Sequence, residues 1–228
     1  MSRTWATGIA AAALALGAAG LLPSRPTAIA AEGAVTAPAP IYDPPDRAGS
    51  RTAVLAGGCF WGVQGVISAV AGYSGGPGTA ADYETVSGGD TGHAEAVRIR
   101  YDPRVVSYGS LLRIYFSVVA DPTQLNRQGP DRGTQYRGAL FPTTPAQAKV
   151  ARAYLTQLSE AQLWPAPIVT RIESFKGFYP AEAYHQDFLA RNPRHPYIMR
   201  NDLPKVAALK RLYPRSWRER PVLVNARG

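Results

Sequence analysis

One short stretch, Gly57-Gly58-Cys59-Phe60-Trp61-Gly62, constrains this chain most, because it holds the only cysteine among 228 residues. It follows an apolar run at residues 52–56, which predicts a strand, and precedes apolar residues at helical spacing over 63–70. The cysteine is therefore expected where a strand turns into a helix. Unpaired N–H groups and the helix dipole favour a thiolate there and lower the pKa of a thiol. Position alone leaves open whether the cysteine is reactive or a buried structural residue.

The composition is that of one globular domain. Hydrophobic residues make up 46% of the chain and charged residues 18%, which is not a disordered balance. The formal net charge is +9, but residues 1–31 carry +2 and residues 203–228 carry +6. The body between them is therefore close to neutral, and a groove for nucleic acid is not expected there.

The first 31 residues have the pattern of an export signal. Arg3 supplies a positive start, residues 6–22 are apolar and small, and residues 28–30 (Ala-Ile-Ala) offer a cleavage site. We therefore expect a periplasmic or secreted protein. The alternative is an uncleaved anchor, because the apolar run is near the shortest length that spans a bilayer.

The rest of the chain divides into three parts. Residues 32–50 are rich in Ala and Pro and predict a flexible linker. Residues 51–202 form the expected catalytic domain. Residues 203–228 form a basic C-terminal tail, expected to be solvated apart from a helical turn or two. Contact of this tail with an anionic membrane surface is the alternative.

Periodicity within the domain predicts interleaved strands and helices, hence mixed α and β structure in one domain. The expected strands are 95–101, 137–141 and 168–175. The expected helices are 107–120, 144–163 (with Thr143 or Thr144 as its cap) and 180–191. Glycine-rich or polar loops are expected at 72–78, 87–93 and 121–135.

Any chemistry at Cys59 needs suitable neighbours. A cysteine hydrolase or acyltransferase needs a histidine base, for which His93 or His185 is available. A non-enzymatic peptide-binding module would use Phe60 and Trp61 as an apolar anchor and leave Cys59 inert. A metal site is not expected, because one cysteine and three histidines show no ligand spacing.

Five stretches resemble motifs of the peptide methionine sulfoxide reductase A family, in that family's order. They are GGCFWG at 57–62, GYSGG at 72–76, SGGDTGHAEAV at 87–97, NRQGPDRGTQYR at 126–137 and AEAYHQ at 181–186. The resemblance covers roughly residues 51–200. It implies an α+β fold, namely a two-layer sandwich around a mixed sheet with a ferredoxin-like core. It also implies reduction of the S epimer of methionine sulfoxide, free or in proteins, without a cofactor.

Carried over by residue, the resemblance makes Cys59 the nucleophile and Glu95 the acid that protonates the sulfoxide oxygen. The resemblance also implies that Tyr83 and Tyr136 hydrogen-bond that oxygen and that Phe60 and Trp61 receive the methyl group. Asp131 would help to hold the substrate backbone, and His185 would support these residues without touching the substrate. The physics agrees, because a sulfoxide oxygen leaves poorly unless it is protonated. A glutamate donates a proton near neutral pH only if an apolar pocket raises its pKa.

The chain departs from the family pattern in one important respect. Attack by Cys59 leaves a sulfenic acid, which many family members resolve with a second cysteine. This chain has no second cysteine. We therefore predict a one-cysteine enzyme that is regenerated by an external thiol, either a thioredoxin-like protein or a small molecule. Ala183 also replaces an acidic residue often found in its motif.

Overall fold

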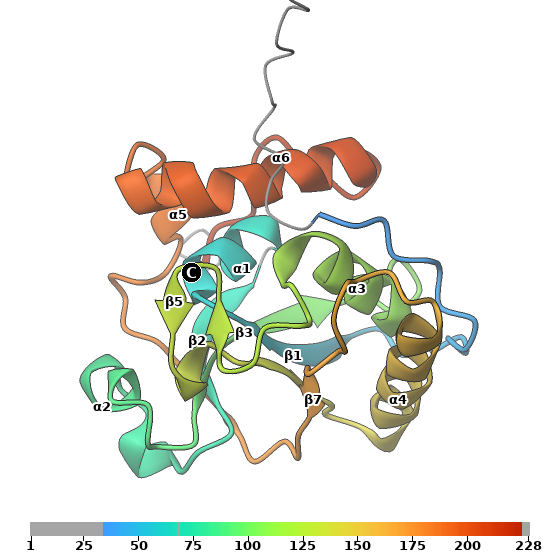
Figure 1. Ribbon diagram of the computed structural model, residues 1–228, viewed down its shortest axis with the longest axis horizontal. Helices are drawn as coiled ribbons and strands as arrows, with labels where there is room; N and C mark the ends of the chain where they lie inside the picture. The colour runs from blue at the N-terminus through green and yellow to red at the C-terminus, as the bar shows by residue number, and fades with distance from the viewer. Residues whose placement is uncertain (1–33, 68, 225–228) are drawn as a thin grey trace, which may run out of the picture.

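A six-stranded mixed sheet organises the computed structural model, which describes residues 34–67 and 69–224 (Figure 1). The strand order is β7-β6-β1-β3-β2-β8, and only the β6–β7 pair is parallel. The strands are β1 (Arg51–Gly57), β2 (Val70–Ser74), β3 (Ala94–Tyr101), β6 (Gly138–Phe141), β7 (Arg171–Ile172) and β8 (Phe178–Pro180). A small hairpin pairs β4 (Arg127–Gln128) with β5 (Asp131–Arg132). The predicted export signal lies outside the described residues.

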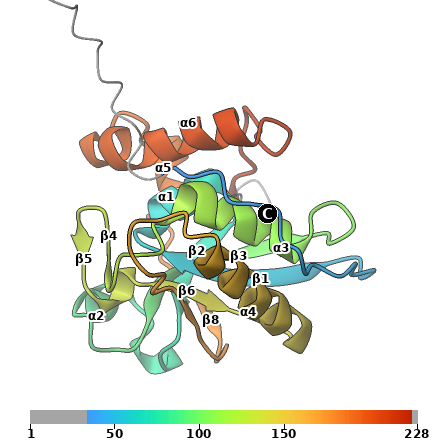
Figure 2. The same ribbon diagram turned by 45° about the vertical axis from the view of Figure 1, so that its right-hand side comes forward.

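The larger helices gather on one face of the sheet, and α6 lies across them as a further layer (Figure 2). They are α1 (Phe60–Val66), α3 (Tyr108–Ile114), α4 (Pro145–Glu160) and α6 (Leu203–Leu212). Of the two short helices, α5 (Phe188–Arg191) packs against α1 near α6, and α2 (Tyr83–Ser87) lies away from that layer (Figure 1). Within the residues that the structure covers, no helix combines the length and apolar character needed to cross a bilayer.

The alternation of β1 divides the core between the two faces of the sheet. Ala53 and Leu55 point to the helices and join the main cluster of buried side chains. Val54 and Ala56 point to the other face, where they join Phe141 in a smaller cluster. The helices thus cover one face of a mixed sheet, and the α+β sandwich expected from the sequence is confirmed.

Several predicted element boundaries are wrong. The glycine-rich loop expected at 72–78 begins as strand β2, because Gly72 lets the ring of Phe178 and the carbonyl of Tyr179 approach closely. The helix expected at 180–191 is reduced to α5 at its end, since residues 181–187 form turns that hydrogen-bond to β2 and α1. The helix after Cys59 starts at Phe60, earlier than expected, and stops at Val66.

The prediction of a flexible linker is also wrong for residues 34–43, which pack against the domain. Ala37 is fully buried, and its N–H donates to the Ser117 hydroxyl at 3.1 Å. The Tyr154 hydroxyl donates to the carbonyl of Pro38 at 2.8 Å. Asp43 accepts from the first turn of α3, at the N–H of Gly109. Ala37 belongs to the main core, so this segment covers apolar surface of the domain. Its Ala- and Pro-rich composition does not predict that contact.

The C-terminal segment is not the solvated tail expected from its charge. Ala208 and Leu209 of α6 are buried against the main core. Beyond α6, the ring of Trp217 packs under the Lys210 ammonium at 4.4 Å. The N–H of Val224 then donates to Asp187 at 2.9 Å. The segment therefore folds onto the domain, because its basic residues alternate with apolar ones that find contacts.

Candidate active site

Cys59 lies between the end of β1 and the first turn of α1, where it is the N-cap residue. The strand-to-helix turn predicted around it is confirmed. Gly58 has φ +85°, a left-handed conformation that favours glycine, and a side chain there would collide with Gln128. The turn therefore holds the thiol half-buried beside the β4–β5 hairpin.

Glu95 on β3 reaches the same turn from the neighbouring strand. Its side chain is only 3% exposed, and Oε2 accepts a hydrogen bond from the Phe60 N–H at 2.9 Å. Burial raises the pKa of Glu95 to about 8, against the opposing effect of the Phe60 N–H. The carboxyl group beside Cys59 is therefore protonated at neutral pH.

The thiol of Cys59 does not have the lowered pKa expected at a helix N-terminus. Burial raises its pKa well above the usual value, and the charges of Glu95 (which is ionised only above about pH 8), Asp202 and Asp131 add to the effect. The hydrogen bond from the Trp61 N–H opposes this rise and does not outweigh it. The expectation failed because the dipole of a short helix competes with desolvation and with carboxylates that arrive from distant segments.

The two tyrosines predicted from the motifs lie near each other, and the ring centre of Tyr83 is 4.6 Å from that of His185. Burial raises the pKa of Tyr136, and the charges of Glu95, Asp131 and Cys59 raise it further, so these groups are neighbours. Tyr83 begins α2, and its N–H donates to Glu182 at 2.8 Å. The two tyrosines therefore come from separate short helical turns that the fold brings together.

Phe60 and Trp61 form an aromatic wall next to the cysteine. Phe60 is 1% exposed, and its ring centre is 5.0 Å from that of His185. Trp61 remains partly exposed and stacks on Phe188, with ring centres 3.8 Å apart and planes 11° apart. The wall is therefore apolar and packs against His185 and Phe188, and the indole of Trp61 is its partly exposed part.

His185 packs against Phe60 and accepts a hydrogen bond from Trp61, and it forms no hydrogen bond with Cys59. The indole N–H of Trp61 donates to Nδ1 of His185 at 3.1 Å. An indole only donates, so Nδ1 is the acceptor and the ring proton of the neutral histidine is on Nε2. Burial lowers the pKa of His185, which keeps the ring neutral.

Two glutamines fix the turn that carries His185. The Gln186 amide donates to the carbonyls of Ala71 and Ala181, each at 2.9 Å, and accepts from the Ala71 N–H. Gln64 on α1 accepts from the N–H of Asp187 at 2.9 Å. The motif at 181–186 therefore positions its histidine through amide hydrogen bonds, and these do not need an acidic residue at 183.

Two residues of the site carry no motif that predicts them from the sequence. The hydroxyl of Tyr197 donates to the carboxylate of Asp131, and its ring meets Trp61 edge-on at 6.0 Å. Asp202 is fully buried against Gly62 of α1, with its nearest cation, the Lys205 ammonium, at 3.6 Å. Burial raises the pKa of Asp202 to about 6. A polar residue just before an apolar helix is an ordinary capping pattern, so no local signal marked Asp202 as part of the site.

The site holds carboxyl, thiol and phenol groups in an aromatic setting. Across residues 34–67 and 69–224, no three His, Cys, Asp or Glu side chains gather as metal ligands do. The arrangement suits a reaction in which a sulfur nucleophile and a proton donor act on one small apolar group.

Comparison with known proteins gives a consistent match to one family. The family described as "Peptide methionine sulfoxide reductase" matches residues 51–216. A relative from Mesorhizobium japonicum, named peptide methionine sulfoxide reductase MsrA 2, is 60% identical over 183 residues, which are 77% of this chain and 94% of the relative. A relative of the same name from Synechocystis is 54% identical over 172 residues, 72% of this chain and 80% of the relative.

Solved structures agree with the sequence comparison. The reduced form of Mxr1 from Saccharomyces cerevisiae is 34% identical with a TM-score of 0.54, and the match covers 67% of this chain and 91% of that one. Methionine sulfoxide reductase A of Corynebacterium diphtheriae is 30% identical with a TM-score of 0.55, covering 64% and 77%. The chain therefore belongs to the peptide methionine sulfoxide reductase family, as an oxidoreductase of the MsrA type.

Proposed function

We propose that this enzyme reduces the S epimer of methionine sulfoxide, free or in proteins, with Cys59 as its only redox-active group. The observation that carries the proposal is the buried carboxyl of Glu95, bound at 2.9 Å to the N–H that follows Cys59. This contact supports Glu95 as the proton donor to a substrate attacked by Cys59. The raised pKa of Glu95, about 8, keeps that proton available at neutral pH.

The reaction moves one oxygen atom and two electrons. The sulfur of Cys59 attacks the sulfoxide sulfur while Glu95 protonates the sulfoxide oxygen. The oxygen ends on Cys59 as a sulfenic acid, and the substrate leaves as a thioether. The proton lost by the Cys59 thiol replaces the one that Glu95 gave, so the half-reaction neither takes up nor releases a proton.

The other motif residues orient the sulfoxide. Tyr83 and Tyr136 donate hydrogen bonds to its oxygen, which stabilises the charge that develops there. Phe60 and Trp61 receive its methyl group. Because the oxygen and the methyl group are held on different sides, only one epimer presents its sulfur to Cys59. Asp131, fixed by its hydrogen bond from Tyr197, holds the backbone of the substrate.

Regeneration needs a reductant from outside, since the chain has one cysteine. The family uses no prosthetic cofactor. An external thiol attacks the sulfenic acid, which releases water and leaves a mixed disulfide. A second thiol then frees Cys59 and leaves as the oxidised disulfide. A thioredoxin-like protein or a small thiol supplies these two electrons.

A racemic sulfoxide substrate tests this proposal. With excess dithiothreitol, we expect reduction to stop when about half of a racemic N-acetylmethionine sulfoxide is consumed, because one epimer fits the site. Without reductant, we expect one equivalent of thioether per chain and a Cys59 that reacts with dimedone. Chiral chromatography and mass spectrometry measure the two outcomes.

Two results would contradict the proposal. Consumption of both epimers at similar rates would mean that the aromatic wall does not select one of them. Repeated turnover without reductant would mean that Cys59 is not oxidised in the reaction. Hydrolysis of esters or amides without reductant would support a cysteine hydrolase instead.

We further propose that the protein is exported and repairs oxidised proteins outside the cytoplasm. The pattern of residues 1–31 supports this proposal. In cells that express the full chain, the enzyme should fractionate with the periplasm or the medium, with residues 1–31 absent by mass spectrometry. Recovery of the intact chain in the cytoplasm would refute export.

Contact between the C-terminal segment and an anionic membrane surface is a further proposal. Arg215, Arg218 and Arg220 are exposed beyond α6 and supply the charge. We expect salt-sensitive sedimentation with phosphatidylglycerol vesicles, weakened when all three are changed to Gln. The substitutions leave Trp217 in place and are expected to leave the fold intact. Equal sedimentation of the two proteins would contradict this contact.

A further inference from the structure

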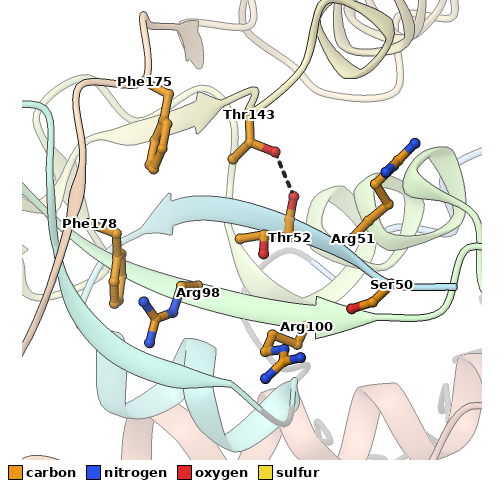
Figure 3. A pocket seen from close by; sticks show the side chains of 8 residues that line it. All are labelled: Ser50, Arg51, Thr52, Arg98, Arg100, Thr143, Phe175 and Phe178. Atoms are coloured by element: carbon orange, nitrogen blue, oxygen red, sulfur yellow. Dashed lines mark hydrogen bonds between the residues drawn. The ribbon is translucent and has the colours of Figure 1, made fainter. Parts of the chain in front are cut away.

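A groove of about 670 Å³ lies at the start of β1, and Figure 3 shows the side chains that line it. Thr52 alternates along β1 with Ala53, which points to the helices, so the groove is on the other face of the sheet. Its floor includes Thr52 of β1 and Arg98 and Arg100 of β3, and Thr143 borders it from the loop before α4. Cys59 follows the other end of β1. Gly57 at that end is five strand residues beyond Thr52, which at about 3.3 Å per residue is roughly 16 Å from the groove. The groove is therefore distinct from the candidate active site.

The groove carries two positive charges that the described part of the chain does not neutralise. Arg98 and Arg100 are two residues apart on one strand, so they point to the same face. Neither forms an ion pair with a carboxylate there, whereas the neighbouring Arg51 is paired with Asp46 at 2.7 Å. Adjacent like charges without partners are unfavourable, and a dianion between them would relieve the repulsion.

An aromatic wall adjoins these arginines. The guanidinium of Arg98 lies over the ring of Phe178, 4.9 Å from its centre. Phe175, in the loop between β7 and β8, lines the same groove and is 40% exposed. A large aromatic side chain that stays exposed beside free guanidinium groups offers a surface to a flat apolar group on an anion.

We propose that this groove binds a small phosphate ester with an aromatic or other flat apolar substituent. A phosphate monoester carries nearly two negative charges at neutral pH, which matches the two free guanidinium groups. Guanidinium forks donate paired hydrogen bonds to such oxygens. The apolar substituent packs on Phe175, and the hydroxyls of Thr52 and Thr143 border the phosphate end. The volume lies within the usual range of small-molecule sites.

Calorimetric titration of the full chain with phenyl phosphate and with inorganic phosphate tests this site. We expect one saturable site for phenyl phosphate, bound more tightly than inorganic phosphate. The Arg98→Gln/Arg100→Gln double variant should weaken phenyl phosphate by about tenfold or more. Phe175→Ala should bring the affinity for phenyl phosphate down to that for inorganic phosphate and leave the latter unchanged. Arg100→Gln alone serves if the double variant fails to fold.

Two controls distinguish binding in the groove from general surface charge and from binding at the catalytic cysteine. Arg152→Gln removes an exposed arginine on α4 that does not line the groove, and should leave binding unchanged. Alkylation of Cys59 should also leave it unchanged. Absence of saturable binding, an equal loss in Arg152→Gln, or a loss on alkylation would overturn the proposal. The first two results would indicate general surface charge only, and the third would place the ligand in the catalytic site.

Discussion

Cys59→Ser is expected to abolish the dithiothreitol-driven reduction of the S epimer of methionine sulfoxide, with a loss of kcat/KM of more than about 10⁴-fold. A serine oxygen does not give up two electrons to form the equivalent of a sulfenic acid. Serine therefore removes the redox step itself and not only the nucleophile. Steady-state turnover on the resolved S epimer measures the effect.

The fold of this variant serves as its control. Serine is close to cysteine in size, and the contact between Glu95 and the Phe60 N–H does not involve the sulfur. Urea unfolding should therefore give a midpoint close to that of the unaltered protein. Retained activity in a folded Cys59→Ser protein would refute the assignment of Cys59, and with it the whole proposed mechanism.

Glu95→Gln is expected to lower kcat by about 10²- to 10⁴-fold with little change in KM, because the amide keeps the hydrogen bond from Phe60 but has no acidic proton to give. In the unaltered enzyme kcat/KM should fall as the pH rises through about 8, where Glu95 loses its proton. Stopped-flow turnover over pH 6–10 measures both. Glu160→Gln, an exposed change at the end of α4, is the matched control.

The same variant has a consequence for stability that a role in proton transfer alone would not produce. The folded pKa of Glu95 is raised from 4.5 to about 8, so the native state holds a proton that the unfolded chain releases. This contribution to stability is complete below pH 4.5 and is lost as the pH rises through 8. Glutamine removes the dependence, so Glu95→Gln should gain stability relative to the unaltered protein between pH 5 and 9. A constant difference across that range would contradict the burial of this carboxyl.

Much of the fold followed from local patterns. The alternation at 95–101 and the helical spacing after Thr144 correspond to β3 and α4, with the Thr144 hydroxyl capping the N–H of Gln147 at 3.2 Å. These predictions succeeded because each depends on residues close together in the sequence. The helix predicted at 180–191 is wrong over residues 180–187 because a distant contact decides the structure there. The side-chain amide of Gln186 hydrogen-bonds to β2, and the segment forms turns instead of a helix.

The candidate site divides in the same way. Motifs predicted Cys59, Glu95 and the aromatic wall, which the structure brings to one end of the sheet. Tyr197 and Asp202 were missed, since they lie at the C-terminal end of the predicted domain and outside all five motifs. Their place depends on α6 packing across α1, which burial of apolar residues along α6 decides.

The sequence alone shows that the chain has a single thiol, and it predicts that this thiol lies between a strand and a helix and is regenerated by an outside reductant. The direction in which the pKa of that thiol is shifted depends on the tertiary structure. The turn alone favours a lowered pKa, but burial and the carboxylates of Glu95, Asp202 and Asp131 raise it. Desolvation and charge depend on which distant segments meet in space, and local sequence does not record those contacts.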